Sequence, residues 1–369
     1  MNALNIMSRF NVGGTSQWLY QLSRGLDERK IANVLLVGDC PKGEQEDDRL
    51  SEINHIRIPG LGPGTSPIET LRAFFAIRKA IKEINPDIVN THTSKAGVIG
   101  RIAAKSVKSR VKVVHTYHGH VLKGYFNPFI SFTIGLVEFI LKFITDKFFV
   151  AGENVQLHLE RLKIVPKNSI LVFPGVPQME RRNLDSIRKV LEIPEDAIVF
   201  AWLGRKVKIK RLDRILNLAS LRPQYFFIIA GDGERLEKTY PDYFRDKSIV
   251  NVKEIGITSP ANVWMSADVC LMTSDNEAIP IAAIEASLCH IPVVSTDVGA
   301  TNEIVIHNTT GFLVREFPSQ MLQFMDQLAN SKALREKMGA AAHKLAVSKF
   351  SPKNSLDIQV DAYRALLEN

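Results

Sequence analysis

Short apolar runs alternate with helical patterns along the whole chain, and this alternation limits the fold more than any other feature. In the first half, the predicted strands are Leu4–Ser8, Val34–Val37, Asp87–Asn90 and Val111–Thr116, and the predicted helices are about Thr15–Leu26 and Ile68–Ile84. The second helix is amphipathic, with apolar positions at Ile68, Leu71, Phe74, Phe75, Ala76, Ile77 and Ile81. A strand–helix–strand order of this kind predicts a parallel sheet with helices on both faces.

The same alternation begins again after a turn-rich junction at Phe173–Pro177. The predicted strands of the second half are Ile198–Leu203, Phe226–Ala230, Val250–Lys253, Val269–Met272 and Pro292–Ser295. A chain of 369 residues is longer than one core usually supports. We therefore expect two facing Rossmann-like α/β domains, residues 1–174 and 175–349, with an interdomain cleft that binds ligands. Residues 350–369 contain an amphipathic helix at Ser355–Leu367, which we expect to pack back on the first domain.

Charge is distributed unevenly between the halves. Residues 1–174 hold 23 Lys or Arg and 15 Asp or Glu, a net charge of +8, whereas residues 175–369 hold 24 of each and are neutral. A basic half suggests an anionic partner such as a lipid surface or nucleic acid. Three scattered cysteines do not form a disulfide framework, and no secretory leader or membrane-spanning run is visible, so we expect a cytoplasmic protein.

Two glutamates, Glu277 and Glu285, stand on either side of Pro280. The apolar run Val269–Met272 before them predicts a buried strand, and Pro280 favours a helix start, so a helix is expected over Pro280–Leu288. Glu277 then lies on the loop at the strand's carboxyl end and Glu285 lies on the helix. Ligands of open α/β sheets bind at such loops, and the free N–H groups of a helix start favour an anion. The pair therefore predicts a nucleotide-sugar site.

Other motifs also follow predicted strands. Gly13 and Gly14 let the backbone approach a ligand closely, although the dinucleotide fingerprint is absent. His118 and His120 follow Val111–Thr116; we find no third ligand at zinc-like spacing, so a polar histidine is favoured over a metal site. Five cations that suit a diphosphate lie within residues 205–211, namely Arg205, Lys206, Lys208, Lys210 and Arg211. Gly231-Asp232-Gly233 is a further turn that could line the pocket.

Taken in order, these motifs resemble glycosyltransferase family 4, the retaining nucleotide-sugar transferases of the GT-B fold. The matching segments are Val12–Thr15, Thr91–Gly97, Thr116–His120, Leu203–Arg205 with Lys210-Arg211, Gly231–Gly233, and the glutamate pair with Pro292–Val294. The segments His92–Gly97 and His118–Phe126 look most like bacterial transferases of capsule, O-antigen and exopolysaccharide assembly.

The resemblance implies a role for each matching residue. Gly13 and Gly14 would admit the donor phosphates, His118 would lie beside the transferred sugar, and Arg205 and Lys210 would hold the diphosphate. The remaining donor-binding residues would be Gly233, Glu277, Ile279, Pro280 and Glu285, with Glu277 near the sugar and Glu285 at the ribose. Catalytic function would rest on His118, Glu277, Arg205 and Lys210. Relatives often carry Gly in place of Ala278 and Thr or Phe in place of Ile279, so the donor sugar is open.

The implied reaction is transfer of a hexose-type sugar from a UDP- or GDP-linked donor with retention of configuration, and the donor is a substrate rather than a cofactor. No divalent metal is expected, because Arg205 and Lys210 supply the positive charge. The implied acceptor is a glycan linked to undecaprenyl or another lipid. The Phe-, Ile- and Leu-rich residues Phe129–Val150 carry four charges, which argues against spanning. We expect this segment to pack on the first sheet, with insertion at the membrane surface as the alternative. The basic half predicts peripheral contact with anionic lipid on the inner face of the cytoplasmic membrane.

Three other readings remain open. One is a GT-B transferase with a soluble sugar or sugar-phosphate acceptor, such as a sucrose- or trehalose-type synthase. Another is a nicotinamide oxidoreductase, against which the missing glycine fingerprint counts. The third is a nucleic-acid-binding protein, but the basic residues of the first half are dispersed, so no nucleic-acid partner is expected.

Overall fold

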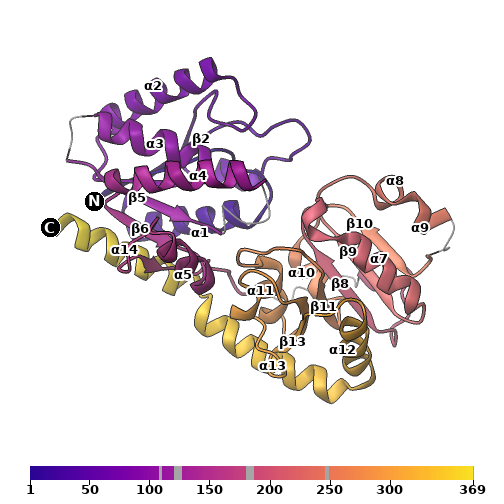
Figure 1. Cartoon of the computed structure of the whole chain (residues 1–369). Helices are drawn as coiled ribbons and strands as arrows, with labels where there is room; N and C mark the ends of the chain where they lie inside the picture. Colours follow the sequence, from indigo (N-terminus) through magenta and orange to yellow (C-terminus); the bar gives the residue numbers. More distant parts are fainter. Residues whose placement is uncertain (108–109, 120–126, 180–186, 246–248, 369) are drawn as a thin grey trace. The chain divides into compact units, whose positions relative to one another are not determined.

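The computed structural model describes residues 1–107, 110–119, 127–179, 187–245 and 249–368. The chain forms two compact units (Figure 1). Unit 1 consists of Met1–Gly175 together with Ser351–Asn369, and unit 2 is Val176–Phe350. The chain therefore returns to its first unit for its last segment.

A sheet of seven parallel strands forms the centre of unit 1, in the order β3-β2-β1-β4-β5-β6-β7. In chain order the strands are β1 (Asn2–Met7), β2 (Ala32–Val37), β3 (His55–Arg57), β4 (Ile88–His92), β5 (Lys112–Tyr117), β6 (Lys147–Val150) and β7 (Ile170–Leu171). The four longest strands, β1, β2, β4 and β5, are largely buried on both faces, as expected where helices cover both sides of a parallel sheet.

Helices cover this sheet on both faces. They are α1 (Gly14–Glu28), α2 (Pro67–Ile84), α3 (Ser94–Ser106), α4 (Pro128–Leu141), α5 (Glu153–Arg161) and α14 (Pro352–Glu368), with 3₁₀ turns η1 (Asp48–Glu52) and η2 (Lys142–Ile144). Leu4 and Ile6 of β1 pack in one apolar cluster with α2 and α3, whereas Ala3 and Met7 pack in another with α1 and α14. Because side chains alternate along a strand, these clusters lie on opposite faces of the sheet.

Helix α14 is held to unit 1 by apolar and polar contacts. Leu356 and Val360 are buried in the cluster formed with α1, and the hydroxyl of Tyr363 accepts a hydrogen bond from Asn90 Nδ2 of β4 at 2.8 Å. The predicted helix Ser355–Leu367 thus corresponds to α14, which begins three residues earlier.

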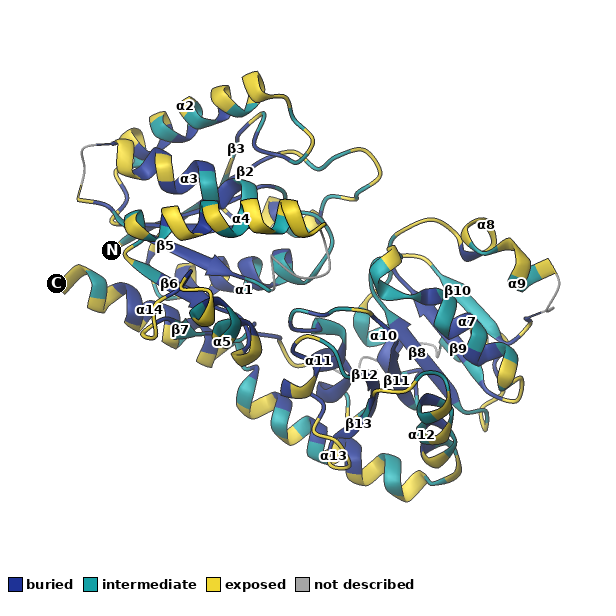
Figure 2. Ribbon diagram, viewed as in Figure 1, coloured by how far each residue is buried: buried dark blue, intermediate teal, exposed yellow. Residues whose placement is uncertain are grey.

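The apolar segment that begins at Phe129 is not packed on the sheet as predicted. In α4 the buried residues are Glu138 and Leu141, and most of the helix surface is exposed (Figure 2). Glu138 is buried because it pairs with Arg101 Nη2 of α3 at 2.6 Å and accepts a hydrogen bond from Tyr117 Oη at 2.6 Å. The expectation was wrong because α4 packs against the rest of unit 1 only through the side that carries Glu138 and Leu141. The end of this segment forms strand β6, whose last three residues are buried.

The apolar pattern of α2 was also only partly interpreted correctly. This helix begins with a capping box between Ser66 and Glu69, and it buries Ala73, Ile77, Ala80 and Ile81. Ile68, Leu71 and Phe75, which we assigned to the apolar face, are exposed. Two alanines and two isoleucines thus form the core face of α2, which packs against α3.

Unit 2 has its own sheet of six parallel strands, in the order β10-β9-β8-β11-β12-β13. The strands are β8 (Val199–Leu203), β9 (Phe226–Ala230), β10 (Val252–Ile255), β11 (Val269–Met272), β12 (Val293–Thr296) and β13 (Gly311–Val314). The helices are α6 (Ile187–Val190), α7 (Leu212–Leu221), α8 (Leu236–Thr239), α9 (Pro241–Arg245), α10 (Pro260–Trp264), α11 (Ile281–Leu288), α12 (Ser319–Asn330) and α13 (Lys332–Lys349), with turns η3 (Lys208–Lys210) and η4 (Thr301–Glu303). The predicted strands coincide with β8 to β12 within two residues.

Candidate functional site: a carboxylate–lysine pair between two loops

The strand order of unit 2 reverses between β8 and β11. The chain leaves β8 toward β9 on one side of the sheet and leaves β11 toward β12 on the other. The loops after these two neighbouring strands therefore diverge at their carboxyl ends, which is where open α/β sheets bind ligands. The predicted cations follow β8 and the predicted glutamates follow β11.

Lys210 and Glu277 meet at this point. Lys210 ends η3, and its Nζ lies 2.7 Å from both carboxylate oxygens of Glu277. Ser274 Oγ donates a third hydrogen bond to Glu277 Oε1 at 2.6 Å, and Glu277 is only 5% exposed. A largely buried carboxylate needs such partners. Glu277 is therefore not an ordinary surface glutamate.

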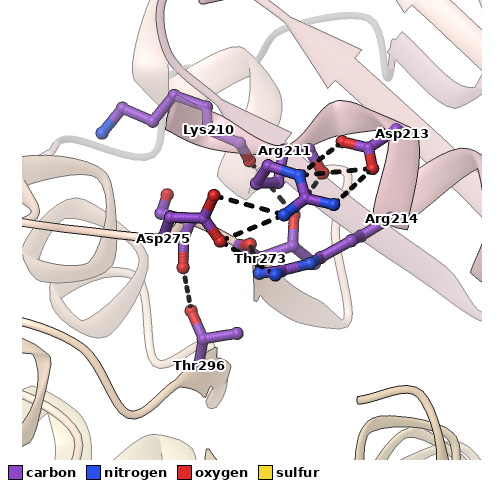
Figure 3. Close-up of polar contacts among 8 residues, drawn as sticks. Lys210, Arg211, Asp213, Arg214, Thr273, Asp275 and Thr296 are labelled. Carbon is purple, nitrogen blue, oxygen red and sulfur yellow. Dashed lines mark hydrogen bonds and ion pairs between the residues drawn. The ribbon is translucent and has the colours of Figure 1, made fainter. Parts of the chain in front are cut away.

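The two loops are also joined through their backbones. Asp275 N donates to Ile209 O at 2.9 Å, and Thr273 Oγ1 donates to Arg211 O at 3.0 Å. Arg211 in turn bonds Asp213 and Asp275 (Figure 3). These hydrogen bonds raise the pKa of Arg211 and hold the pKa of Asp213 below its usual value.

The five cations of residues 205–211 consequently have different surroundings. Arg211 bonds carboxylates of its own unit, and Lys206 pairs with Glu254 at 2.6 Å. The side chain of Lys210 extends away from the Arg211–Asp213 pair in Figure 3 and reaches Glu277 instead. Lys208 is exposed and Arg205 is half-buried. Sequence alone presented these residues as one basic loop.

Helix α11 carries the second glutamate. Ile281 is its first residue, one position later than predicted, and Pro280 and Ile279 are buried at its start. Glu285 is 3% exposed, so it is not a solvated helix residue. Burial, then the charge of Glu285, then that of Glu277, raise the pKa of the Cys270 thiol on β11. The charges of both carboxylates therefore act on the same thiol of β11.

Glycines bring the neighbouring loops together. Gly231 and Gly233 have positive φ, and a Cβ added to Gly233 would lie 2.7 Å from Lys206 Cβ. Lys206 N donates to Asp232 O at 2.7 Å, which joins the loop after β8 to the loop after β9. Gly233 thus lies beside the basic loop, and donor binding by it stays a prediction.

In unit 1 the strand order reverses between β1 and β4, and the predicted residues lie near this reversal. Helix α1 begins at Gly14, with Gly13 as its N-cap. His118 follows β5, and its ring packs at 89° to that of Trp18 of α1, with ring centroids 4.7 Å apart. Burial lowers the pKa of His118 to about 3. His120, the second histidine of that motif, lies outside the described residues.

Sequence reasoning missed several members of these groups. It assigned no role to Ser274, although this residue lies three positions before Glu277 and bonds it. His92 was matched to the family but given no function, and Asn5 was taken as an ordinary strand residue. Within the described ranges, no group of three or more His, Cys, Asp or Glu could hold a metal ion.

Family comparisons agree with this geometry. The family described as Glycosyltransferase Family 4 matches residues 12–178, and that described as Glycosyl transferases group 1 matches residues 183–345. The two matches follow each other along the chain and fall on its two sheets.

The chain belongs to these glycosyltransferase families.

This glycosyltransferase is 25% identical to the O-antigen biosynthesis glycosyltransferase WbnH of Escherichia coli over 94% of the chain and 96% of that protein. It is 27% identical to the UDP-Gal:alpha-D-GlcNAc-diphosphoundecaprenol alpha-1,3-galactosyltransferase of Escherichia coli, over 78% and 77% of the two chains. Among solved structures, Anabaena HepE in complex with UDP and glucose superposes with a TM-score of 0.84 at 17% identity, covering 99% of this chain and 100% of HepE. The predicted GT-B fold class is thereby confirmed.

Proposed function

We propose that this glycosyltransferase moves a sugar, with retention of configuration, from a nucleotide diphosphate sugar to a lipid-linked glycan. The pathway would be bacterial O-antigen, capsule or exopolysaccharide assembly. The observation that carries the proposal is the Lys210–Glu277 pair at the strand reversal of unit 2, held at 2.7 Å beside the start of α11. A cation, a carboxylate and a helix N-terminus at one place suit a diphosphate with a sugar on it.

Each part of the donor has a proposed partner. Arg205 and Lys210 bind the diphosphate, with the first N–H groups of α11 behind Ile279 and Pro280. Glu285 accepts hydrogen bonds from the ribose, and Glu277 accepts them from the sugar. Gly233, Gly13 and Gly14 leave room for the nucleotide and its phosphates. The nucleotide is UDP or GDP; HepE, a structural neighbour, holds UDP and glucose.

The reaction then depends on charge stabilisation. The bond from the anomeric carbon to the phosphate oxygen breaks, and a bond from the same carbon to an acceptor hydroxyl oxygen forms on the same face. The diphosphate leaves with one more negative charge and takes the acceptor's proton. Lys210 and Arg205 stabilise that charge from fixed positions, which is the largest contribution in many enzymes. These cations take the place of a divalent ion, so no metal is required.

Replacement of Lys210 by Ala tests the donor site, with Lys208→Ala as the matched control two residues away on η3. We expect Lys210→Ala to lose at least about a hundredfold in turnover with its fold intact, because it removes a preorganised charge. Lys208→Ala should keep most activity. A nucleotide diphosphate should raise the melting temperature equally with and without EDTA. Normal turnover in Lys210→Ala would refute the site, and loss of the shift in EDTA would refute metal independence.

The lipid part of the acceptor is supported by a relative. The Escherichia coli galactosyltransferase named above uses a diphosphoundecaprenol-linked sugar according to its name. An acceptor with such a tail resides in the bilayer, so the enzyme has to reach the inner face of the cytoplasmic membrane. Turnover with a soluble sugar or sugar phosphate, and none with a lipid-linked acceptor, would favour the alternative reading instead.

Helix α4 supports membrane contact. Phe129, Phe132, Leu136, Ile140 and the following Phe143 of η2 are 50–78% exposed, and their spacing of three or four residues places them on one face. The only ionisable residue of α4 is Glu138, which is buried in its ion pair. A contiguous exposed apolar surface of this kind marks a contact with a membrane or with another protein. Its 14 residues extend only about 21 Å, whereas spanning takes about 30 Å. Among the described residues no helix is long and apolar enough to cross a bilayer.

Positive charge accompanies this face. Lys142 Nζ lies 3.9 Å from the ring centroid of Phe139 and also donates to Lys163 O. Residues 1–174 carry +8 and residues 351–369 carry 2 Lys or Arg against 3 Asp or Glu, so unit 1 retains about +7. We therefore propose that α4 and η2 insert shallowly into an anionic bilayer while basic residues contact the headgroups.

Vesicle sedimentation tests this contact. We expect the wild type to bind vesicles that contain anionic lipid more tightly than neutral ones at low salt. Replacement of Phe129, Phe132 and Phe143 by Ser should weaken binding at least about a hundredfold, since each buried Phe is worth about 1.5–3 kcal/mol. The control replaces Val190 and Val250 of unit 2, which are 76% and 79% exposed. Unchanged vesicle binding by the triple variant would reject α4 as the anchor, and concentration-dependent self-association that the triple variant abolishes would identify the face as a dimer contact.

A further inference from the structure

A chain of hydrogen bonds connects β1 to the predicted catalytic histidine. Asn5 Oδ1 lies 3.1 Å from His92 Nε2, and His92 Nδ1 lies 2.8 Å from His118 Nε2. Asn5 and His92 are buried in adjacent strands. His118 Nδ1, at the far end, is buried, and the described part of the structure gives it no hydrogen-bond partner. The remaining three ring nitrogens of His92 and His118 each have a hydrogen-bond partner.

The order of partners fixes where the protons lie. Both rings are neutral, because burial lowers the pKa of His118 to about 3 and that of His92 well below its ordinary value. A neutral imidazole has one N–H and one lone pair. Asn5 Oδ1 only accepts, so His92 Nε2 carries the proton and His92 Nδ1 accepts. His118 Nε2 must then donate, and His118 Nδ1 is left with a lone pair.

We propose that Asn5 and His92 are positioning residues that hold His118 in the Nε2–H tautomer, so that its Nδ1 accepts a hydrogen bond from a carbohydrate hydroxyl. This inference rests on the proposed function for the identity of the ligand. A bare nitrogen repels phosphate oxygens and carbonyls, which are acceptors themselves, and attracts groups that donate. Sugar hydroxyls donate, so the end of this relay discriminates the sugar from the diphosphate.

Burial makes the choice of tautomer consequential. A buried acceptor without a partner is unfavourable, and a ligand hydroxyl removes that cost. Trp18 restrains the ring from one side, with its plane at 89° to the imidazole. The sugar would therefore meet a nitrogen whose direction and protonation are set before it binds, which is the arrangement that lowers the cost of binding.

The tautomer can be measured without substrate. Long-range ¹H–¹⁵N correlation spectra of the full-length protein, labelled at histidine, distinguish a protonated ring nitrogen from a bare one. His118→Gln identifies the resonances. At neutral pH we expect proton attachment at Nε2 and a bare Nδ1. A dominant Nδ1–H form would overturn the inference, because it would mean that the Asn5 amide faces His92 with its nitrogen and that the whole relay runs in reverse.

Two variants separate positioning from ordinary packing. Asn5→Leu removes the accepting oxygen and should convert His118 into a mixture of tautomers. Asn90→Leu is the matched control on the neighbouring strand, directly opposite Asn5 in the sheet register: it removes the bonds to Tyr363 and Thr116 but none of the hydrogen bonds that join Asn5, His92 and His118. The control should lower the melting temperature and leave the tautomer unchanged. The inference would be overturned if the tautomer of His118 were unchanged in Asn5→Leu, or if it changed equally in Asn5→Leu and Asn90→Leu.

Ligand binding provides an independent readout. Asn5→Leu should lower kcat/KM for the sugar nucleotide roughly tenfold, the effect of one hydrogen bond. The thermal shift caused by the free nucleotide diphosphate, which lacks the sugar, should be unchanged. An equal loss for both ligands would show a structural defect and refute positioning. If no nucleotide binds the wild type while the tautomer is as expected, the proposed function fails and the relay stands.

Discussion

The pair of Arg101 and Glu138 is the most deeply buried ion pair that the structure describes, and it fixes α4 to α3 and β5. The side chains are 0% and 3% exposed. Tyr117 donates to the same carboxylate oxygen as Arg101. Removing one partner of such a pair leaves an uncompensated charge in the interior.

We therefore expect Glu138→Ala to lower the free energy of unfolding by about 3–5 kcal/mol in urea titrations. The double variant Arg101→Met with Glu138→Leu should recover most of that loss, because apolar groups of similar volume replace both charges. Equal losses in the single and double variants would show that Tyr117 and packing, rather than charge, dominate at this site.

Buried histidines make the stability of unit 1 depend on acid pH. Burial places the pKa of His118 near 3, and those of His92 and His115 well below the ordinary 6.5. Above about pH 6.5 both folded and unfolded chains leave the rings neutral. As pH falls toward 3 the unfolded chain binds protons that the folded chain does not, so stability falls.

His118 should contribute a slope that approaches about 1.4 kcal/mol per pH unit between pH 6.5 and 3, and His92 and His115 should add slopes of the same sign below pH 6.5. Denaturant titrations at pH 7, 6 and 5 measure it. His118→Gln should make the slope shallower by the contribution of one proton. An unchanged slope in His118→Gln would mean that this ring is protonated in the folded chain.

At the scale of the elements, sequence predicted the strands that are short, continuous and apolar. β9 and β11 coincide with their predictions because buried parallel strands have that pattern. β3, β7 and β13 were missed; they have three, two and four residues and lie at the sheet edges. The exposure of α4 could not be predicted, since an apolar helix has the same composition in a core and at a membrane.

The candidate site divides in the same way. Glu277, Glu285 and Lys210 were predicted because each follows a strand or starts a helix, and that local context can be recognised in the sequence. The ion pairs of Lys206 with Glu254, and of Arg211 with Asp213 and Asp275, were not predictable. Such pairs form between loops that are distant in sequence, and identical residue types differ only in what lies opposite.

Removal of α14 tests how far unit 1 depends on it. A chain that stops after Phe350 loses Leu356 and Val360 from the apolar cluster with α1, and Asn90 loses Tyr363. We expect faster hydrogen exchange in α1, with α2 on the other face unchanged. Equal exchange in the shortened and full-length chains would mean that α14 adds little stability.

At the scale of the whole molecule, the two units differ in how the chain builds them. Val176–Phe350 contains the second sheet, its core, and Lys210, Glu277 and Glu285. We expect this segment alone to unfold cooperatively and to be stabilised by a nucleotide diphosphate, as seen by thermal shift. Failure to fold would show that unit 1 supports it. If the segment folds but a nucleotide diphosphate does not raise its melting temperature, residues of unit 1 are needed for donor binding.

Because unit 1 needs both ends of the chain, its completion is delayed during synthesis. Residues 176–350 must emerge before α14 does. At about 5–20 residues per second, those 175 residues take roughly 10–35 s to translate. Unit 2 can therefore be complete before unit 1, because unit 1 gains α14 only after residues 176–350 have been synthesised, and until then the surface of α1 that packs on α14 stays uncovered.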